Sequence, residues 1–167
     1  MDAEAGSKPA SMKNHTSVAR TSGRELVVTR TFDAPARLVF EAWTRPELLR
    51  KWWVPKSIDI ALLSCEVDAR VGGRYRFEFA GGEAGPMVFF GRYLEVTPHA
   101  RLVWTNEESE AGSVTTLTFE ESNGRTLVVV HELYPSKEAL DAAGTGSADA
   151  LVETFRQLDE LLVTLGG

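Results

Sequence analysis

The sequence has few of the residues that mark redox, metal-binding or nucleophile-based enzymes. Cys65 is the only cysteine among 167 residues, which excludes an intramolecular disulfide, a zinc ribbon and a CxxC redox motif. The three histidines are far apart and form no recognisable metal-ligand pair. Spacing alone leaves a Ser-His-Asp arrangement open, but no G-x-S-x-G elbow is present. We therefore predict no metal, no cofactor and no identifiable catalytic residue.

Long apolar runs and clusters of basic residues are also missing. No stretch reaches the roughly 18 to 20 apolar residues that are needed to cross a bilayer, so no membrane span is expected. The formal net charge of −6 and the pI near 5.1 argue against a nucleic-acid partner, which would require clustered Lys and Arg. No apolar segment follows a basic start at the N-terminus, and a cytoplasmic location is the resulting expectation.

The first 23 residues differ in composition from the remainder of the chain. Residues 1–23 are rich in Ala, Ser, Lys, Gly and Thr and have no periodic apolar face, which predicts a disordered tail. Residues 24–167 have the length of one domain and can bury a substantial core without disulfides or metal. We therefore expect a single folded domain over residues 24–167.

The segment from Phe32 to Pro55 contains three of the four tryptophans and two helix-start signals. Asp33 followed by Pro35 predicts a capped helix that begins near Pro35. Its apolar positions recur at the spacing of one buried helical face: Leu38, Val39, Ala42 and Trp43. A second short helix is expected after Thr44-Arg45-Pro46-Glu47, ending before Pro55.

The adjacent tryptophans of the second helix should serve different purposes. Trp52 and Trp53 would project about 100° apart on a helix, so one can pack in the core while the other lines a cavity. Core packing is the simpler interpretation of each residue, because aromatic side chains bury large areas wherever they pack.

The remainder of the chain alternates between strands and turns before a final helix. The strands are expected over residues 25–32, 57–67, 74–80, 87–96, 101–106, 113–121 and 125–134, and the helix over 147–164. About six or seven strands joined by short turns indicate a curved antiparallel sheet, and the amphipathic helix would rest on its concave face. This is an α+β fold, and a cavity between helix and sheet is expected.

Two polar residues of the expected strands allow more than one interpretation. Arg30 has the parity of apolar neighbours, so either it lies at a wet rim or it pairs with an acid, and the sequence favours the rim. His131 shares parity with Leu127, Val129 and Leu133, which predicts an inward side chain. It would be a structural hydrogen-bonding residue, a ligand contact, or an acid or base.

Four short motifs resemble a known family. F-D-A-P at 32–35, V-F-E-A-W-T at 39–44, K-W-W-x-P at 51–55 and R-x-G-G-R-Y at 70–75 are similar to the bacterial proteins related to the activator of the Hsp90 ATPase. That family belongs to the START and birch-pollen-allergen-like helix-grip group, and the resemblance covers about residues 25–165. It implies a sheet wrapped around the C-terminal helix, with a cavity for a lipid-like, polyketide-like or aromatic molecule. Similar sequences carry Gly-Trp near the start of that helix, where this chain has no tryptophan and Phe155 follows.

The sequence and the resemblance together lead to one hypothesis and two alternatives. The hypothesis is binding of an apolar small molecule. The first alternative is a cyclase-, aromatase- or hydrolase-like enzyme in which His131 or Tyr134 orients a polar group, and the second is a co-chaperone-like interaction domain. A homodimer is left open. The candidate cavity residues are Trp52, Trp53, Phe77, Phe79, Met87, Phe89, Trp104, Phe119, His131, Tyr134, Leu151 and Phe155.

Overall fold

The structure is a computed structural model that describes residues 16–57, 60–81, 85–107, 112–143 and 146–166. Its strands are β1 (Ser17–Arg20), β2 (Glu25–Phe32), β3 (Leu62–Val67), β4 (Arg74–Phe79), β5 (Met87–Thr97), β6 (Arg101–Thr105), β7 (Val114–Ser122) and β8 (Arg125–Leu133). Its helices are α2 (Ala36–Thr44), α3 (Pro46–Trp52), α4 (Lys137–Ala143) and α5 (Gly146–Gly166). Among these residues, no helix is long and apolar enough to cross a membrane.

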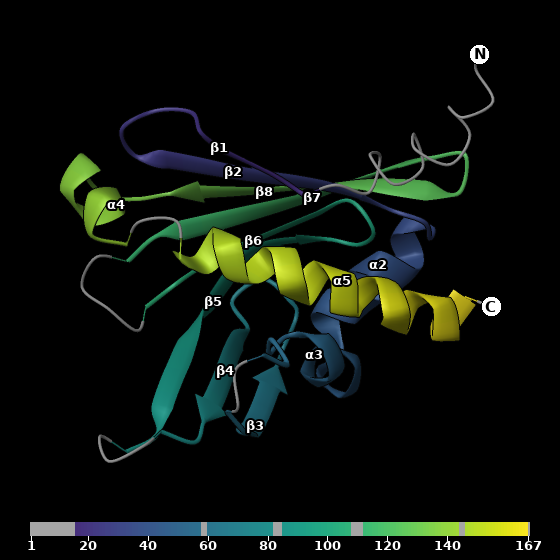
Figure 1. Ribbon diagram of the computed structural model, residues 1–167, viewed down its shortest axis with the longest axis horizontal. Helices are drawn as coiled ribbons and strands as arrows, with labels where there is room; N and C mark the ends of the chain where they lie inside the picture. Colours follow the sequence, from purple (N-terminus) through teal and green to yellow (C-terminus); the bar gives the residue numbers. More distant parts are fainter. Residues whose placement is uncertain (1–15, 58–59, 82–84, 108–111, 144–145, 167) are drawn as a thin grey trace.

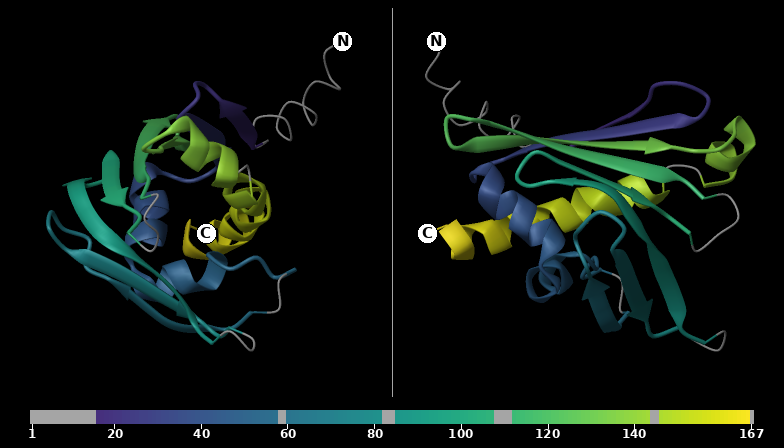
Figure 2. Two further views of the ribbon diagram at one scale, coloured as in Figure 1. Left: turned by 90° about the vertical axis from the view of Figure 1, so that its left-hand side faces the viewer. Right: turned by 180° about the vertical axis from the view of Figure 1, so that it is seen from behind.

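The strands form one sheet in the order β1-β2-β8-β7-β6-β5-β4-β3, and every neighbouring pair is antiparallel. The sheet curves strongly, and α5 lies across its concave side with α2 and α3 beside the C-terminal part of α5 (Figures 1 and 2). The expected α+β helix-grip architecture is therefore confirmed. The described residues form an eight-stranded sheet, which has more strands than the six or seven expected.

The additional strand is β1, and it corrects the expectation of an unstructured segment up to residue 23. All four residues of β1 are exposed, yet the strand pairs with β2 from Ser17↔Thr29 to Arg20↔Leu26. β1 is held by backbone hydrogen bonds to β2 and not by buried side chains, so its own sequence has no apolar pattern that would predict a strand. The expectation for residues 1–15 lies outside the described residues.

The two tandem helices form as expected, but the expected caps are wrong. Pro35 is the residue before the first turn of α2, which has no cap from its own segment. The backbone N–H of Ala36 instead donates to Glu121 Oε1 at 2.9 Å, while Asp33 pairs with Arg125 at 2.6 Å. The Glu121 carboxylate therefore caps the N-terminus of α2 in place of Asp33, because β7 ends beside this helix terminus.

The hydrophobic core lies between α2, α3, α5 and the strands near the centre of the sheet. β2 alternates in burial along its whole length, with Leu26, Val28 and Phe32 almost fully buried. The rings of Trp43 and Trp52 meet edge to face with centroids 4.8 Å apart, a geometry that aromatic pairs prefer. This aromatic packing fixes α2 and α3 against α5.

Arg30 is buried, and the expected wet rim is wrong. Its side chain is 4% exposed and pairs with the carboxylate of Asp159 on α5. It also donates to the backbone oxygen of Phe155 at 3.3 Å, and its guanidinium lies 4.9 Å from the centre of the Phe32 ring. The buried charge is tolerated because a carboxylate, a carbonyl and an aromatic face surround it.

One turn and one further glycine behave as their residues predict. Asn123 and Gly124 both have positive φ angles, 55° and 76°, in the tight hairpin between β7 and β8. Gly91 allows a close backbone approach, since a Cβ there would lie 1.8 Å from the Thr105 oxygen and 2.8 Å from the Tyr75 ring. Gly91 therefore leaves the space that the Tyr75 ring occupies.

Candidate functional site

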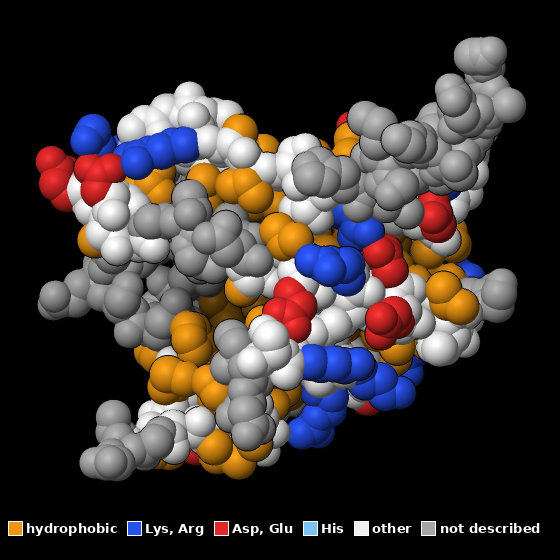
Figure 3. Space-filling view, in the orientation of Figure 1, with side chains coloured by type: hydrophobic (Ala, Val, Ile, Leu, Met, Phe, Trp, Pro, Cys, Tyr) orange, Lys and Arg blue, Asp and Glu red, His pale blue; other side chains and the backbone are white. Residues whose placement is uncertain are grey.

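A cavity of about 690 Å³ lies between the concave face of the sheet, α4 and the N-terminal half of α5. Figure 3 shows hydrophobic side chains around a recess in the part of this face that lies between β5 and the start of α5. Most of the lining is apolar or aromatic, and the polar groups are few. The lining residues include Trp43, Leu49, Trp53, Tyr75, Phe77, Phe79, Met87, Phe89, Tyr93, Trp104, Asn106, Thr115, Leu117, Val130, Glu132, Tyr134, Ala139, Leu151 and Thr154.

The neighbouring tryptophans of α3 divide between core and cavity, as their angular separation predicts. Trp52 is fully buried and its indole N–H donates to the backbone oxygen of Ala42 at 3.0 Å. Trp53 is partly exposed and lines the cavity. The side-chain amide of Gln157 on α5 holds this segment by donating to the oxygens of Trp52 and Val54, at 3.1 and 2.9 Å. The cavity wall is thus attached to α5 on either side of Trp53.

One inward-facing row of residues crosses the sheet at the level of the cavity. Glu132 on β8 pairs across the strands with Thr115 on β7, Thr115 pairs with Trp104 on β6, and Trp104 pairs with Tyr93 on β5. The Tyr75 ring contacts this row, with its centroid 6.4 Å from Trp104 and 6.0 Å from Tyr93. The antiparallel register therefore places one carboxyl group and a cluster of three aromatic rings along the same row, with Thr115 between Glu132 and Trp104.

Glu132 is an acidic side chain in a largely apolar surrounding. The Tyr134 hydroxyl donates to Glu132 Oε1 at 3.1 Å. Burial raises the pKa of Glu132 above its ordinary value, and the hydrogen bond from Tyr134 and the charge of His131 oppose this only in part. Burial likewise raises the pKa of Tyr134 to about 12, so its hydroxyl keeps its proton at neutral pH. Glu132 and Tyr134 form a hydrogen-bonded polar pair on a largely apolar cavity wall.

A second polar group, centred on Asn106, is satisfied by its neighbours. The Tyr75 hydroxyl donates to Asn106 Oδ1 at 3.0 Å and to the Thr105 backbone oxygen at 2.9 Å. The Asn106 amide donates to the hydroxyls of Ser113 and Thr115, both at 2.9 Å. These bonds tie the ends of β6 and β7 together at the cavity, and they engage the donors of Asn106.

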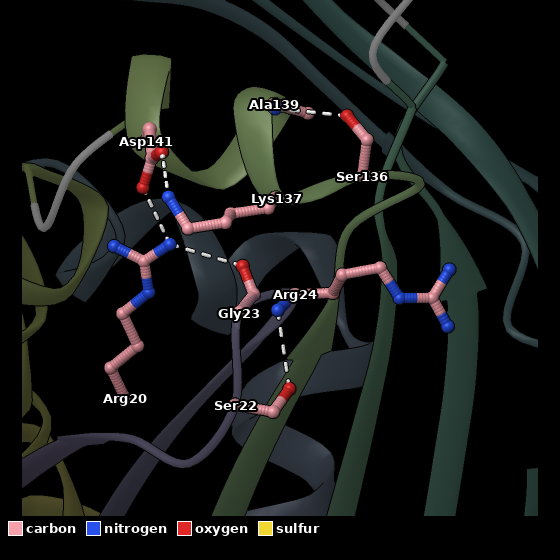
Figure 4. Close-up of polar contacts among 8 residues, drawn as sticks. All are labelled: Arg20, Ser22, Gly23, Arg24, Ser136, Lys137, Ala139 and Asp141. Atoms are coloured by element: carbon pink, nitrogen blue, oxygen red, sulfur yellow. Dashed lines mark hydrogen bonds and ion pairs between the residues drawn. The ribbon is translucent and has the colours of Figure 1, made fainter.

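The short helix α4 forms one side of the cavity and is fastened to the turn between β1 and β2. Asp141 accepts from Arg20 at 2.6 Å and from Lys137 at 2.8 Å, and Arg20 also donates to the Gly23 backbone oxygen (Figure 4). Lys137 and Arg20 lower the pKa of Asp141, which keeps it charged. α4 contributes Ala139, Ala142 and Ala143 to the lining. Exposed ion pairs and the buried side chain of Leu140 therefore hold this part of the wall.

The structure brings eight of the twelve sequence-predicted residues to the cavity and leaves four elsewhere. At the cavity are Trp53, Phe77, Phe79, Met87, Phe89, Trp104, Tyr134 and Leu151. Trp52, Phe119 and Phe155 are buried in the core, where Trp43 contacts all three rings at centroid distances from 4.8 to 5.8 Å. These three aromatic residues pack around Trp43 in the core instead of lining the cavity. Whether the eight residues bind a ligand stays a prediction.

The predicted inward orientation of His131 is wrong. On β8 the buried residues are Thr126, Val128 and Val130, so the inward position nearest the cavity is Glu132. His131 lies on the opposite face, where its Nε2 is 2.8 Å from Glu25 Oε2. The hypothesis that His131 orients a ligand group in this cavity therefore has no geometric basis.

Sequence reasoning missed Glu132, Thr115, Asn106, Tyr75 and Tyr93 as cavity residues. Both parities of β8 are apolar through Val128, Val129 and Val130, so alternation could not decide between His131 and Glu132. A signal existed for Tyr75, which shares strand parity with Phe77 and Phe79. Asn106 and Thr115 meet only in the folded register and had no sequence signal.

The composition of the cavity lining indicates what the site can hold. In the described ranges, no group of three or more His, Cys, Asp or Glu side chains could hold a metal ion. What the site offers is apolar volume, aromatic faces and a few hydrogen-bonding groups, which is the usual composition of a small-molecule pocket.

Solved structures of similar architecture come from several bacteria. A Rhodobacter sphaeroides protein aligns with a TM-score of 0.82 and 26% identity, over 90% of this chain and 99% of its own. Protein NE0264 from Nitrosomonas europaea aligns with a TM-score of 0.76 and 25% identity, over 87% of this chain and 98% of its own. Protein CV1439 from Chromobacterium violaceum aligns with a TM-score of 0.69 and 27% identity, over 84% and 98%. These likenesses cover almost the whole of each partner.

A comparison with functionally curated proteins finds no match. The family model of the activator of Hsp90 ATPase homolog 1-like proteins, in contrast, matches residues 33–163, which span most of the chain and include α2, α3, the sheet from β3 onward and most of α5. The chain belongs to the family of activator of Hsp90 ATPase homolog 1-like proteins.

Proposed function

We propose that this protein binds a hydrophobic small molecule in the cavity between the sheet and α5. The observation that carries the proposal is the cavity itself: about 690 Å³ of space with an apolar and aromatic lining inside a domain whose remaining core is closely packed. Protein interiors contain few voids larger than a water molecule, because open apolar volume forfeits packing energy. An apolar ligand would recover that energy by removing its own surface and the lining from water.

The size and lining favour a lipid-like, polyketide-like or aromatic ligand. Pockets for small molecules span roughly 300 to 1,000 Å³, and this cavity lies within that range. Trp53, Phe77 and Trp104 offer flat faces for stacking. Met87 and Phe89, at the start of β5, also line the cavity and are partly exposed. The ligand would enter beside α4, whose exposed ion pairs can open at small energetic cost.

Native mass spectrometry of the purified protein, followed by rebinding of any released molecule, tests this proposal. A bound apolar mass that rebinds and changes tryptophan emission is the expected result, because Trp43, Trp53 and Trp104 all border the cavity. No bound mass, together with no response to fatty acids, flavonoids and polyketide-like aromatic compounds, would contradict it.

A pair of matched tryptophan substitutions on α5 connects the binding to this cavity. Leu151→Trp fills the cavity from its wall and should abolish rebinding. Val163→Trp adds the same side chain at a position that is 72% exposed, and rebinding should persist. Equal affinity in the two variants would place any binding elsewhere on the protein.

A further inference from the structure

The charged side chains of the cavity wall indicate which class of ligand the cavity would bind, provided that the proposed binding function holds. Among the described lining residues, Glu132 is the one carboxylic acid, and none is a lysine, arginine or histidine. The wall around Glu132 therefore offers a negative charge and no positive side chain. A ligand carboxylate would meet repulsion there and would find no ion-pair partner.

Three of the polar side chains at this level of the wall already donate hydrogen bonds within the protein. The Tyr134 hydroxyl donates to Glu132 itself, at 3.1 Å. The Asn106 amide donates to Ser113 and Thr115, and the Tyr75 hydroxyl donates to Thr105 and Asn106. The capacity that remains on Glu132 and Tyr134 is acceptor capacity, because an ionised carboxylate has about four lone-pair sites and a phenol oxygen also accepts. A ligand group that donates hydrogen bonds suits the Glu132–Tyr134 pair better than one that accepts them.

Aromatic rings occupy the same level of the wall. Trp104 and Tyr93 follow Glu132 and Thr115 in the inward-facing row, and Tyr75 contacts both rings. The faces of tryptophan and tyrosine rings attract cations, and they do so more strongly where water is excluded. A carboxylate and electron-rich rings together are the usual surroundings of a bound ammonium group.

We infer that the ligand of this cavity is an apolar molecule with a basic amine, held as an ammonium group by Glu132 on the wall that also presents the rings of Trp104 and Tyr93. The ammonium supplies the positive charge that the wall lacks and donates to Glu132 and to the Tyr134 oxygen. Its hydrocarbon part fills the volume along Phe77, Phe79 and Leu151. Burial, which penalises an isolated Glu132 carboxylate, would then be compensated by a fixed opposite charge.

A series of eight-carbon compounds with different polar groups tests the inference by calorimetry at neutral pH and low salt. The four probes are octylamine, octanol, methyl hexyl ketone and octanoate, which have the same number of carbon atoms and differ in charge and hydrogen bonding. Octylamine should bind at least about tenfold more tightly than octanol, because a buried charged hydrogen bond contributes more than a neutral one. Octanoate should bind most weakly of the four.

The Glu132→Gln variant tests whether the Glu132 carboxylate causes the tighter binding of octylamine. Glutamine keeps the size of the side chain and removes its charge, so the advantage of octylamine over octanol should fall to about twofold or less. Octanol should still bind to the variant, and a cooperative unfolding transition shows that the variant stays folded. Loss of octanol binding in Glu132→Gln with a cooperative unfolding transition retained would mean that Glu132 shapes the cavity instead, and would overturn the inference.

Different failures of this series have different meanings. If octanol binds and octylamine has no advantage, or if the ketone or octanoate binds most tightly, the amine inference is wrong and the hydrophobic binding function stands. If none of the four binds, and the apolar panel described above does not bind either, both the inference and the proposed function fail.

Discussion

The two halves of the interior contain similar aromatic residues but pack them in opposite ways. Around α2, α3 and the middle of α5, the rings of Phe32, Trp43, Trp52 and Phe155 meet at centroid distances from 4.8 to 6.4 Å and leave three of the four side chains with no exposure. Around the first half of α5 and β4 to β6, the rings of Tyr75, Phe77 and Trp104 border the cavity. We call these the closed half and the open half.

The difference between the halves arises from what covers the sheet. In the closed half, the two tandem helices α2 and α3 fill the angle between α5 and the strands (Figure 2). Helix α3 contacts both α5 and β3. In the open half, the same curved sheet faces α5 with only the short α4 beside it. A sheet that curves away from a straight helix leaves volume wherever no further element fills it. Aromatic composition alone therefore does not distinguish a core from a pocket.

Alanine substitution of the adjacent tryptophans compares the two halves most directly and should have the largest effect. Trp52→Ala removes a fully buried ring and a hydrogen bond to Ala42, and should lower the free energy of unfolding by about 3–5 kcal/mol. Trp53→Ala should cost less than half of that, because its ring already borders open space. Urea unfolding followed by far-ultraviolet circular dichroism measures both. Equal losses would show that the two halves are packed alike.

The ion pair between Arg30 and Asp159 should rank second, because it fastens α5 to β2 inside the closed half. Asp159→Asn leaves the buried guanidinium without its countercharge and should lower the free energy of unfolding by about 1–3 kcal/mol. The double variant Arg30→Met/Asp159→Leu removes both charges and should recover most of this loss. If the double variant is less stable than Asp159→Asn, the other contacts of Arg30 contribute more than its ion pair.

The pH dependence of stability should reveal the buried acid of the open half, with a smaller effect than the two changes above. The folded-state pKa of Glu132 is raised, so the folded protein binds more protons than the unfolded chain between the two pKa values. Stability contributed by Glu132 is therefore present below its unfolded pKa and is lost as the pH rises through the raised folded pKa. Glu132→Gln should gain stability relative to wild type at neutral pH and lose this advantage below about pH 4. A constant difference across this range would contradict the raised pKa.

The tether of α4 should show the smallest change in global stability. Asp141→Asn weakens exposed contacts with Arg20 and Lys137, so the unfolding transition should not shift measurably. Amide exchange in α4 should accelerate, because the helix is short and these contacts hold it against the β1–β2 turn. Glu138→Gln on the same helix serves as the control, since no described contact joins Glu138 to that turn. Unchanged exchange in Asp141→Asn would show that packing of the buried Leu140 holds α4 by itself.

Sequence patterns predicted most of the fold because its local signals were strong. The alternation of Glu25–Phe32 gives the exact bounds of β2, and the spacing of Leu38, Val39, Ala42 and Trp43 identifies the buried face of α2. The candidate site was predicted in part, since aromatic residues on inward strand parity reach the cavity. Trp52, Phe119 and Phe155 show the limit of that reasoning, because the same ring can complete a core or border a void.

The sequence by itself determined where most of the helices and strands lie, the tight turn at Asn123 and Gly124, and the different directions of Trp52 and Trp53. These follow from local backbone preferences and from the fixed angle between neighbouring residues. Only the tertiary structure decided that Glu132 and not His131 faces the cavity, because β2 and β7 set the register of β8. It also decided that Arg30 is buried, because Asp159, distant in sequence, comes into contact with it. Contacts between residues that are remote along the chain leave no pattern in either local segment, so folding alone brings them together.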